Sequence, residues 1–287
     1  MRILLAVDGS EQSQEAARFM AHLVPAERVT ILHALDAPRP GYPMMMPEVA
    51  KDIYRTVEKG MREDGERLLK DVTSLLPADT GPISTRLEVG KAAEVIVSVA
   101  EREHADLILM GTRGRSAIEE VMLGSVSHRV AANAPCPVLV VNGPAPSLRS
   151  IVLAVEGPED VEAARRVLSL KPFRHCPEVT ALTVLPLGQP IWPGGISQTE
   201  SLREKTLRCA WAFVWDLAGQ LSPFGYQASG LVGMGSPATV IIQQATALNA
   251  DLIAVGSRAG SELSRFLLGS VSHGVLHRST IPVLVFR

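Results

Sequence analysis

The sequence contains one long pattern twice, and this repeat constrains the fold more than any other feature. Ala105–Gly111 (ADLILMG) recurs as Ala250–Gly256 (ADLIAVG), and Leu123–His128 (LGSVSH) recurs without change as Leu268–His273. Both pairs are 145 residues apart. A period this long describes a whole domain and not one unit of a stacked solenoid.

Two copies of one domain are therefore expected, at residues 1–143 and 150–287. Matching segments open the copies, since Ile3–Gly9 reads ILLAVDG and Ile151–Gly157 reads IVLAVEG. The stretch Gly143–Ser147 between the copies has the glycine and proline content of a linker.

Each copy alternates short apolar runs with segments of helical periodicity. Continuous apolar runs of four to eight residues are typical of strands buried on both faces. Strands alternating with helices predict an α/β fold with an open parallel sheet and helices on both faces. In the first copy we expect strands at Ile3–Val7, Val29–Leu35, Ile83–Val89, Leu107–Met110 and Val138–Val141, and helices from Ser10, from about Glu48 to Leu76, at Ala92–Arg102 and at Gly124–Asn133.

Composition excludes several classes of partner. The net charge of -2 and the pI of about 6.4 give no basic surface for nucleic acid. No apolar run approaches the ~18 residues of a membrane-spanning helix, and the start of the chain does not have the pattern of a signal peptide. Three cysteines without C-x-x-C spacing favour a reducing compartment. We expect a cytoplasmic protein that binds neither nucleic acid nor membrane.

The segment after the fourth strand has the chemistry of a phosphate site. Ligands of open parallel sheets bind beyond the carboxyl ends of the strands. Here Gly111–Gly114 (GTRG) precedes a nine-residue spacer and then Gly124–Ser127 (GSVS), which opens a helix. A helix start offers unpaired N–H groups and partial positive charge to an anion, serines add hydroxyl donors, and Arg113 adds charge. One glycine alone would indicate only a turn, but the combination predicts a phosphate cradle.

This spacing, Gly111-x-x-Gly114-x9-Gly124-Ser125, resembles the ATP-binding motif of the universal stress protein family. The opening strand with Asp8 resembles the family as well, and the likeness covers both halves nearly end to end. It implies two repeated five-stranded parallel sheets, each with strand order 3-2-1-4-5. It also implies that ATP lies across the carboxyl ends of the first and fourth strands.

The resemblance also implies roles for individual residues. Asp8 would lie by the ribose, the backbone around Ala34 would contact the adenine, and Met110 and Gly111 would line the ribose and base. The phosphates would be held by Gly114, Gly124, Ser125, Val126 and Ser127. Family members pair through their fifth strands, which suggests Val138–Val141 lying against Val283–Phe286 within one chain, with a homodimer as a further possibility.

The function expected from these features is that of an ATP-binding regulatory or stress-response protein. We expect it to bind ATP with Mg²⁺ in preference to NAD or FAD, and we expect no catalytic residues and no metal site formed by the protein alone, although slow ATP hydrolysis stays compatible with the sequence. Two alternatives remain: an ATP-using enzyme of related architecture, such as an adenylating ligase, and a scaffold that nucleotide merely stabilises.

The second half departs from the motif, so the first half is expected to be the stronger nucleotide site. Ala259 stands at the position of Gly114 and puts a methyl group at the turn, although Gly260, one position later, offers a way to re-form the turn. The second half is expected to be empty or to hold a phosphate-like anion at its retained helix start. Asp8, Ser10 and Gly114 are replaced by Glu156, Pro158 and Ala259.

Two other patterns in the second half are interpreted as structural. Gly233–Ala238 matches the GxGxxA dinucleotide pattern, but it follows a third strand and not a first, so Pro237 is expected simply to start a helix. His273 and His277 are four apart on a helix, but no third ligand with metal-like spacing accompanies them.

Overall fold

A computed structural model of the protein describes residues 1–36, 47–112, 123–186, 196–257 and 268–287, with 47–54 and 196–202 described as backbone only. The chain divides into two compact units. Residues 1–141 supply most of the first unit and residues 142–287 most of the second. The division falls beside the linker-like stretch Gly143–Ser147.

The first unit is built on five parallel strands. Pairing places them in the order β3-β2-β1-β4-β5, so β1 lies between β2 and β4. Ala6 at the end of β1 is level with Leu32 of β2 and Met110 of β4. The carboxyl ends of these three strands therefore meet at one edge. The strands are β1 (Arg2–Ala6), β2 (Arg28–Leu35), β3 (Ile83–Val89), β4 (Leu107–Gly111) and β5 (Val138–Val141).

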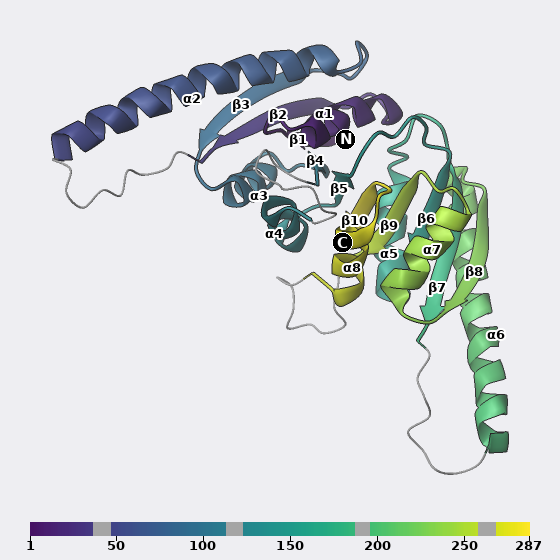
Figure 1. The fold of residues 1–287 in the computed structure, drawn as a ribbon. Coiled ribbons are helices and arrows are strands. Elements are labelled where there is room, and N and C mark those ends of the chain that lie inside the picture. The colour runs from purple at the N-terminus through teal and green to yellow at the C-terminus, as the bar shows by residue number, and fades with distance from the viewer. Residues whose placement is uncertain (37–46, 113–122, 187–195, 258–267) are drawn as a thin grey trace. The chain divides into compact units, whose positions relative to one another are not determined.

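Helices cover both faces of this sheet. α1 and α2 pack together on one face, and α3 packs with α4 on the other (Figure 1). Strands β1, β4 and β5 are almost fully buried, which agrees with the continuous apolar run in each of them. The helices are α1 (Glu11–Phe19), the short 3-10 turn η1 (Met20–His22), α2 (Pro47–Leu75), α3 (Ala92–Arg102) and α4 (Ser125–Asn133).

The second unit repeats the arrangement. Its strands pair in parallel in the order β10-β9-β6-β7-β8, so β6 takes the place of β1 and β9 that of β4. Its strands are β6 (Ser150–Ala154), β7 (Glu178–Leu185), β8 (Ala228–Met234), β9 (Leu252–Gly256) and β10 (Val283–Phe286); its helices are α5 (Pro158–Ser169), α6 (Ile196–Leu221), η2 (Ser222–Phe224), α7 (Pro237–Ala247) and α8 (Ser270–Arg278).

The α/β class with a parallel sheet is confirmed, and the expected elements match the observed ones to within one residue at most ends. Pro237 starts α7 at its first position, as expected. Cys136, two residues before β5, is buried. Across the described part of the chain, none of the helices combines the length and apolar character needed to cross a membrane.

Tyr226 links the end of η2 to α5 in the second unit. Its side chain is buried, and its hydroxyl donates to the carbonyl of Leu168 at 3.1 Å. Burial raises the pKa of this phenol above its ordinary value, and the nearby Cys176 thiol raises it further. The folded state therefore resists the charged form of Tyr226.

This raised pKa predicts an alkaline loss of stability. Unfolded tyrosine titrates near pH ~10, so the contribution of Tyr226 is complete below that pH and is lost as the pH rises towards the folded pKa. Tyr226→Phe should lower the free energy of unfolding at neutral pH by about 1 kcal/mol, because one hydrogen bond is lost. In denaturant titrations from neutral to alkaline pH, the free energy of unfolding of the variant should fall less steeply with pH than that of the wild type. Parallel declines would contradict the assignment.

Candidate functional site

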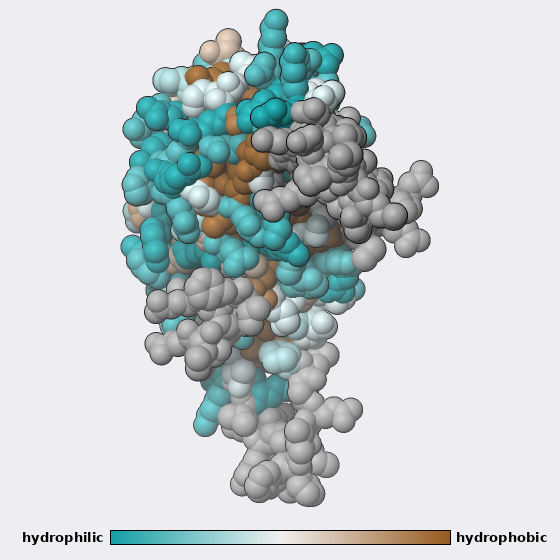
Figure 2. Space-filling view, turned by 90° about the vertical axis from the view of Figure 1, so that its left-hand side faces the viewer, coloured by the Kyte–Doolittle hydropathy of each residue, from teal (hydrophilic) through white to brown (hydrophobic). Residues whose placement is uncertain are grey.

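The site begins where β1 and β4 end side by side. Because Ala6 pairs with Met110, the residues that follow them, Val7–Asp8 and Gly111–Thr112, leave the sheet at the same edge. Strands β2 and β3 point towards the left of Figure 1. Figure 2 shows the molecule from that side, so the carboxyl ends of the first unit's strands face the viewer. Brown apolar surface is visible there within a mostly hydrophilic surround (Figure 2).

Asp8 and two serines close the start of α1. One carboxylate oxygen of Asp8, Oδ1, accepts from the Ser10 backbone N–H at 3.0 Å and from its hydroxyl at 2.6 Å. Ser10 is the N-cap, and its side-chain oxygen accepts from the Ser13 N–H at 3.2 Å. The Ser13 hydroxyl donates to the Ser10 carbonyl at 2.9 Å. The first turn of α1 thus satisfies its own polar groups.

Gly111 is required by close packing. A Cβ at this position would lie 2.7 Å from the backbone carbon of Gln12 and 2.8 Å from the backbone nitrogen of Ser13. The first turn of α1 therefore lies directly over the end of β4, and only glycine leaves room for it. This need for glycine arises from the fold, before any ligand is considered.

The start of α4 differs from that of α1 because its N-cap, Gly124, has no side chain that could cap it. A helix leaves its first N–H groups without helical partners, here those of Ser125, Val126 and Ser127. Gly124 adopts φ -64° and ψ 148°, an extended conformation that any residue can adopt. What this glycine provides is an open helix start and not a left-handed turn.

Thr112 ties this helix start to the sheet. Its carbonyl accepts from the Gly124 N–H at 2.8 Å and from the Ser127 hydroxyl at 2.7 Å. Its own N–H donates to Val141 at the end of β5 at 3.1 Å. The Ser127 hydroxyl therefore already has an acceptor inside the protein, and its donation to a ligand stays a prediction.

A cavity of about 250 Å³ lies between these elements. Eight of the ten predicted site residues line it; Arg113 and Gly114 lie outside the described residues. Sequence reasoning missed Ser13, Thr112 and Ile96, although the helical spacing of Ile96 from Ala92 could have indicated it. The predicted residues brought together are Asp8, Ala34, Met110, Gly111, Gly124, Ser125, Val126 and Ser127.

Comparison with known families decides the relationship. The model of the universal stress protein family matches the chain twice, at residues 1–142 and at residues 147–287. The chain belongs to the universal stress protein family.

Individual relatives agree with a tandem arrangement. A universal stress protein of Mycobacterium tuberculosis is 25% identical over 296 aligned residues, covering 99% of this chain and 96% of that protein. One from Methanocaldococcus jannaschii is 35% identical over 146 residues, covering 50% of this chain and 82% of that protein. The crystal structure of a universal stress protein from Archaeoglobus fulgidus shares the fold, with a TM-score of 0.65 at 19% identity over 99% of this chain and 95% of that one.

The second unit of this universal stress protein has a smaller cavity at the equivalent edge, of about 110 Å³. Val184 lines it at the place of Ala34, because Leu182 pairs with Ala154 as Leu32 pairs with Ala6. The larger side chain takes up part of the space. Of the α8 start, Val271 is the residue that lines this cavity.

The side chain of Asp160 lies directly over Gly256 at the end of β9. A Cβ on Gly256 would collide with the Asp160 carboxylate. The other carboxylate oxygen accepts from the Glu156 backbone N–H at 2.9 Å. In the first unit the equivalent N–H, on Asp8, faces the Ser13 hydroxyl at 3.5 Å. The second unit therefore places a carboxylate, with Glu156 beside it, where the first unit places a neutral hydroxyl.

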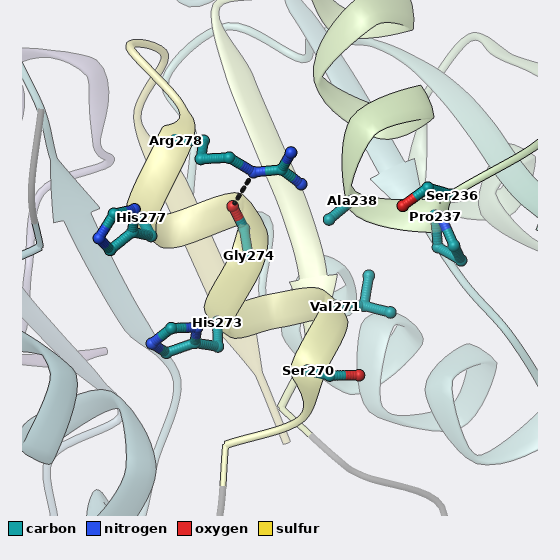
Figure 3. A pocket seen from close by; sticks show the side chains of 9 residues that line it. All are labelled: Ser236, Pro237, Ala238, Ser270, Val271, His273, Gly274, His277 and Arg278. Atoms are coloured by element: carbon teal, nitrogen blue, oxygen red, sulfur yellow. Dashed lines mark hydrogen bonds between the residues drawn. The ribbon is translucent and has the colours of Figure 1, made fainter.

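A separate hollow of about 410 Å³ lies where α7 and α8 pack in the second unit. Gly274 lets the helices approach, since its Cβ would lie 3.0 Å from that of Ala238. The side chains of His273 and His277 stack on one side of α8, and Arg278 lies on the other, donating to the Gly274 carbonyl at 3.2 Å (Figure 3). Among the residues described here, no group of three His, Cys, Asp or Glu could hold a metal ion.

The packing role of Gly111 can be tested by substitution. Gly111→Ala should lower the free energy of unfolding by about 1–3 kcal/mol, because the methyl group meets the backbone of α1 and the helix must shift. Gly143→Ala is the matched control, since no atom lies within 4 Å of its Cβ. Denaturant unfolding of both variants is the measurement, and equal stabilities would show that α1 does not lie where described.

Proposed function

We propose that the first unit of this universal stress protein binds ATP with Mg²⁺ and that the protein acts in the cytoplasm as a nucleotide-dependent regulator of the stress response, without enzymatic turnover. One observation carries the proposal. The start of α4 has no side-chain cap and borders a cavity at the carboxyl ends of β1 and β4. Free N–H groups with the positive end of a helix dipole suit a chain of phosphates.

The rest of the cavity suits a nucleoside. Leu32, Ala34, Ile96 and Met110 supply apolar walls for a base. Asp8 uses Oδ1 for both bonds from Ser10, and Oδ2 takes part in neither. A carboxylate oxygen is a strong acceptor for ribose hydroxyl groups. The cavity therefore has an apolar end and a polar end, as adenosine phosphates do.

Mg²⁺ would be held mainly by the phosphates. Protein sites for this ion usually contribute one or two carboxylates and rely on phosphate oxygens and water for the remaining ligands. Among the described lining residues, Asp8 is the one that carries a carboxylate. When bound, the ion would neutralise phosphate charge, which the open start of α4 also does.

The lining favours a regulator over an enzyme. Within the described lining residues, Asp8 is the one acidic or basic side chain, and its carboxylate already accepts two hydrogen bonds from Ser10. Catalysis by proton transfer or covalent attack needs a placed base or nucleophile. Rapid ATP consumption with a small-molecule acceptor would support the enzyme alternative instead.

Ser125→Pro tests the role of the α4 start. Proline is favoured at the first position of a helix, and the extended conformation of Gly124 is the one that a following proline prefers. The variant should therefore fold while losing one N–H and one hydroxyl at the cavity. We expect ATP affinity measured by calorimetry to fall about tenfold or more, the worth of one hydrogen bond to a charged group.

Two variants serve as controls. Ser270→Pro makes the same change at the first position of α8, where Gly269 has the same extended conformation, and should leave ATP affinity unchanged. Ser125→Ala separates the hydroxyl from the backbone N–H. Equal weakening by the Ser125 and Ser270 proline variants would show that ATP does not depend on the first unit's helix start.

The two units should differ in occupancy. Glu156 and Asp160 put negative charge at the second cavity, and Val184 narrows it, so phosphate binding is disfavoured there. This favours an empty second site over one that holds an anion. Titration of the full chain should give one ATP per chain. Two equal sites, or a nucleotide found beside Gly256 in a structure at saturation, would contradict this asymmetry.

A further inference from the structure

Helix α6 exposes two large aromatic side chains on one face. Trp211 is 40% exposed and Trp215 is 55% exposed. Residues four apart on a helix are neighbours on its surface, so the two rings lie on the same stripe. Contiguous exposed aromatic surface is costly in water and characteristic of protein interfaces.

The first unit provides an internal comparison for this face, because α2 is its equivalent helix. Leu69 and Val72 are buried positions of α2, and Val214 and Leu217, each 145 residues later, are buried positions of α6. The helices therefore pack in the same register. Exposed positions can be compared one by one.

The same positions are charged in α2. Trp211 corresponds to Glu66 and Trp215 to Lys70, both exposed. The fold thus places solvated charges at these positions in one copy and tryptophans in the other. Packing within the unit does not require the aromatic rings, so their presence needs an explanation outside the unit.

Small residues adjoin the rings. Ala212 is exposed between them, where α2 has the long Arg67, and Gly219 is exposed one turn further along. No atom lies within 4 Å of a Cβ built on Gly219. Short side chains let another helix approach closely enough for the tryptophan rings to pack against its backbone and side chains.

The charges on this face are arranged symmetrically about Ala212. Arg208 lies four residues before it and Asp216 four residues after, both exposed. Neither forms an ion pair within the part of the chain that the structure describes; Asp216 accepts a hydrogen bond from Gln220 at 2.7 Å. An antiparallel partner helix with the same sequence would set Arg208 opposite Asp216, and Asp216 opposite Arg208.

We propose that the Trp211–Trp215 face of α6 docks against the same face of a second copy of this chain. The two helices run antiparallel about a two-fold axis at Ala212. The interface buries four tryptophan side chains and forms two symmetric Arg208–Asp216 pairs. Self-complementarity of this kind is what a two-fold interface requires. The proposal is independent of nucleotide binding.

The first test replaces the aromatic residues by their counterparts from the first unit. Sedimentation velocity of the full chain over a concentration series should show a dimer, and Trp211→Glu with Trp215→Lys should give a monomer. Leu248→Glu, which changes another exposed apolar residue (42% exposed), is the control and should leave the dimer intact. A monomeric wild type, or a dimer that survives the tryptophan substitutions, overturns the proposal.

The second test addresses the orientation of the helices. Arg208→Asp places two carboxylates together at each end of the interface and should weaken the dimer about tenfold. Asp216→Arg should do the same, and the double variant should restore dimerisation. Failure of the double variant to restore it, with circular dichroism unchanged, overturns the two-fold arrangement.

Tryptophan fluorescence gives an independent readout. The chain has three tryptophans, of which two lie on this face. Emission should shift to shorter wavelength as the wild-type concentration rises, in step with the dimer fraction. A wild type that stays monomeric and blue-shifts only on binding a different protein would show that the face belongs to another partner.

Discussion

The first turn of α1 rests on the bare backbone of Gly111, and the rest of the site depends on this contact. Because no side chain intervenes, Asp8, Ser10 and Ser13 are held close to the end of β4. The cavity then lies between two helix starts of opposite character. One is closed by its own serine, and the other begins at a glycine that cannot cap it.

The second unit keeps the same arrangement of strands and helices but has a different side chain in the first turn of the helix that follows β6. Gly256 is retained, but the carboxylate of Asp160 now lies against it and accepts the strand-end N–H of Glu156. In the first unit the backbone of the first turn of α1 lies over the glycine, and the Ser13 hydroxyl faces the strand-end N–H of Asp8. Divergence of the two copies therefore needs no change of fold, only a different residue in the first turn of a helix and a larger one at Val184.

Much of the fold could be predicted from the sequence, because buried strands such as Val138–Val141 are short continuous apolar runs between helical segments. Eight of the ten expected site residues line one cavity, as their places at the carboxyl ends of neighbouring strands and at the start of α4 suggest, while their binding of a ligand stays a prediction. The role of Asp160 could not. Its position depends on how a helix packs over a strand 96 residues away in sequence, and no local pattern records that contact. The donation of the Ser127 hydroxyl to Thr112 is likewise a tertiary contact.

The hydrogen bonds around the serine-rich helix start have a consequence for evolution. In the second unit the Gly269 N–H donates to the Ser257 carbonyl, which repeats the attachment of helix to sheet that Gly124 makes in the first, and the Ser272 hydroxyl donates to the Gly269 carbonyl at 3.0 Å within the helix start. Selection for a stable domain would preserve the letters LGSVSH even in a copy released from any ligand. Conservation of this block among descendants of the duplication would therefore measure the need to fold. Ancestry of ligand binding would have to be traced at Asp160 and at its counterpart Gln12, which lies 148 residues earlier, as Ile3 does from Ile151.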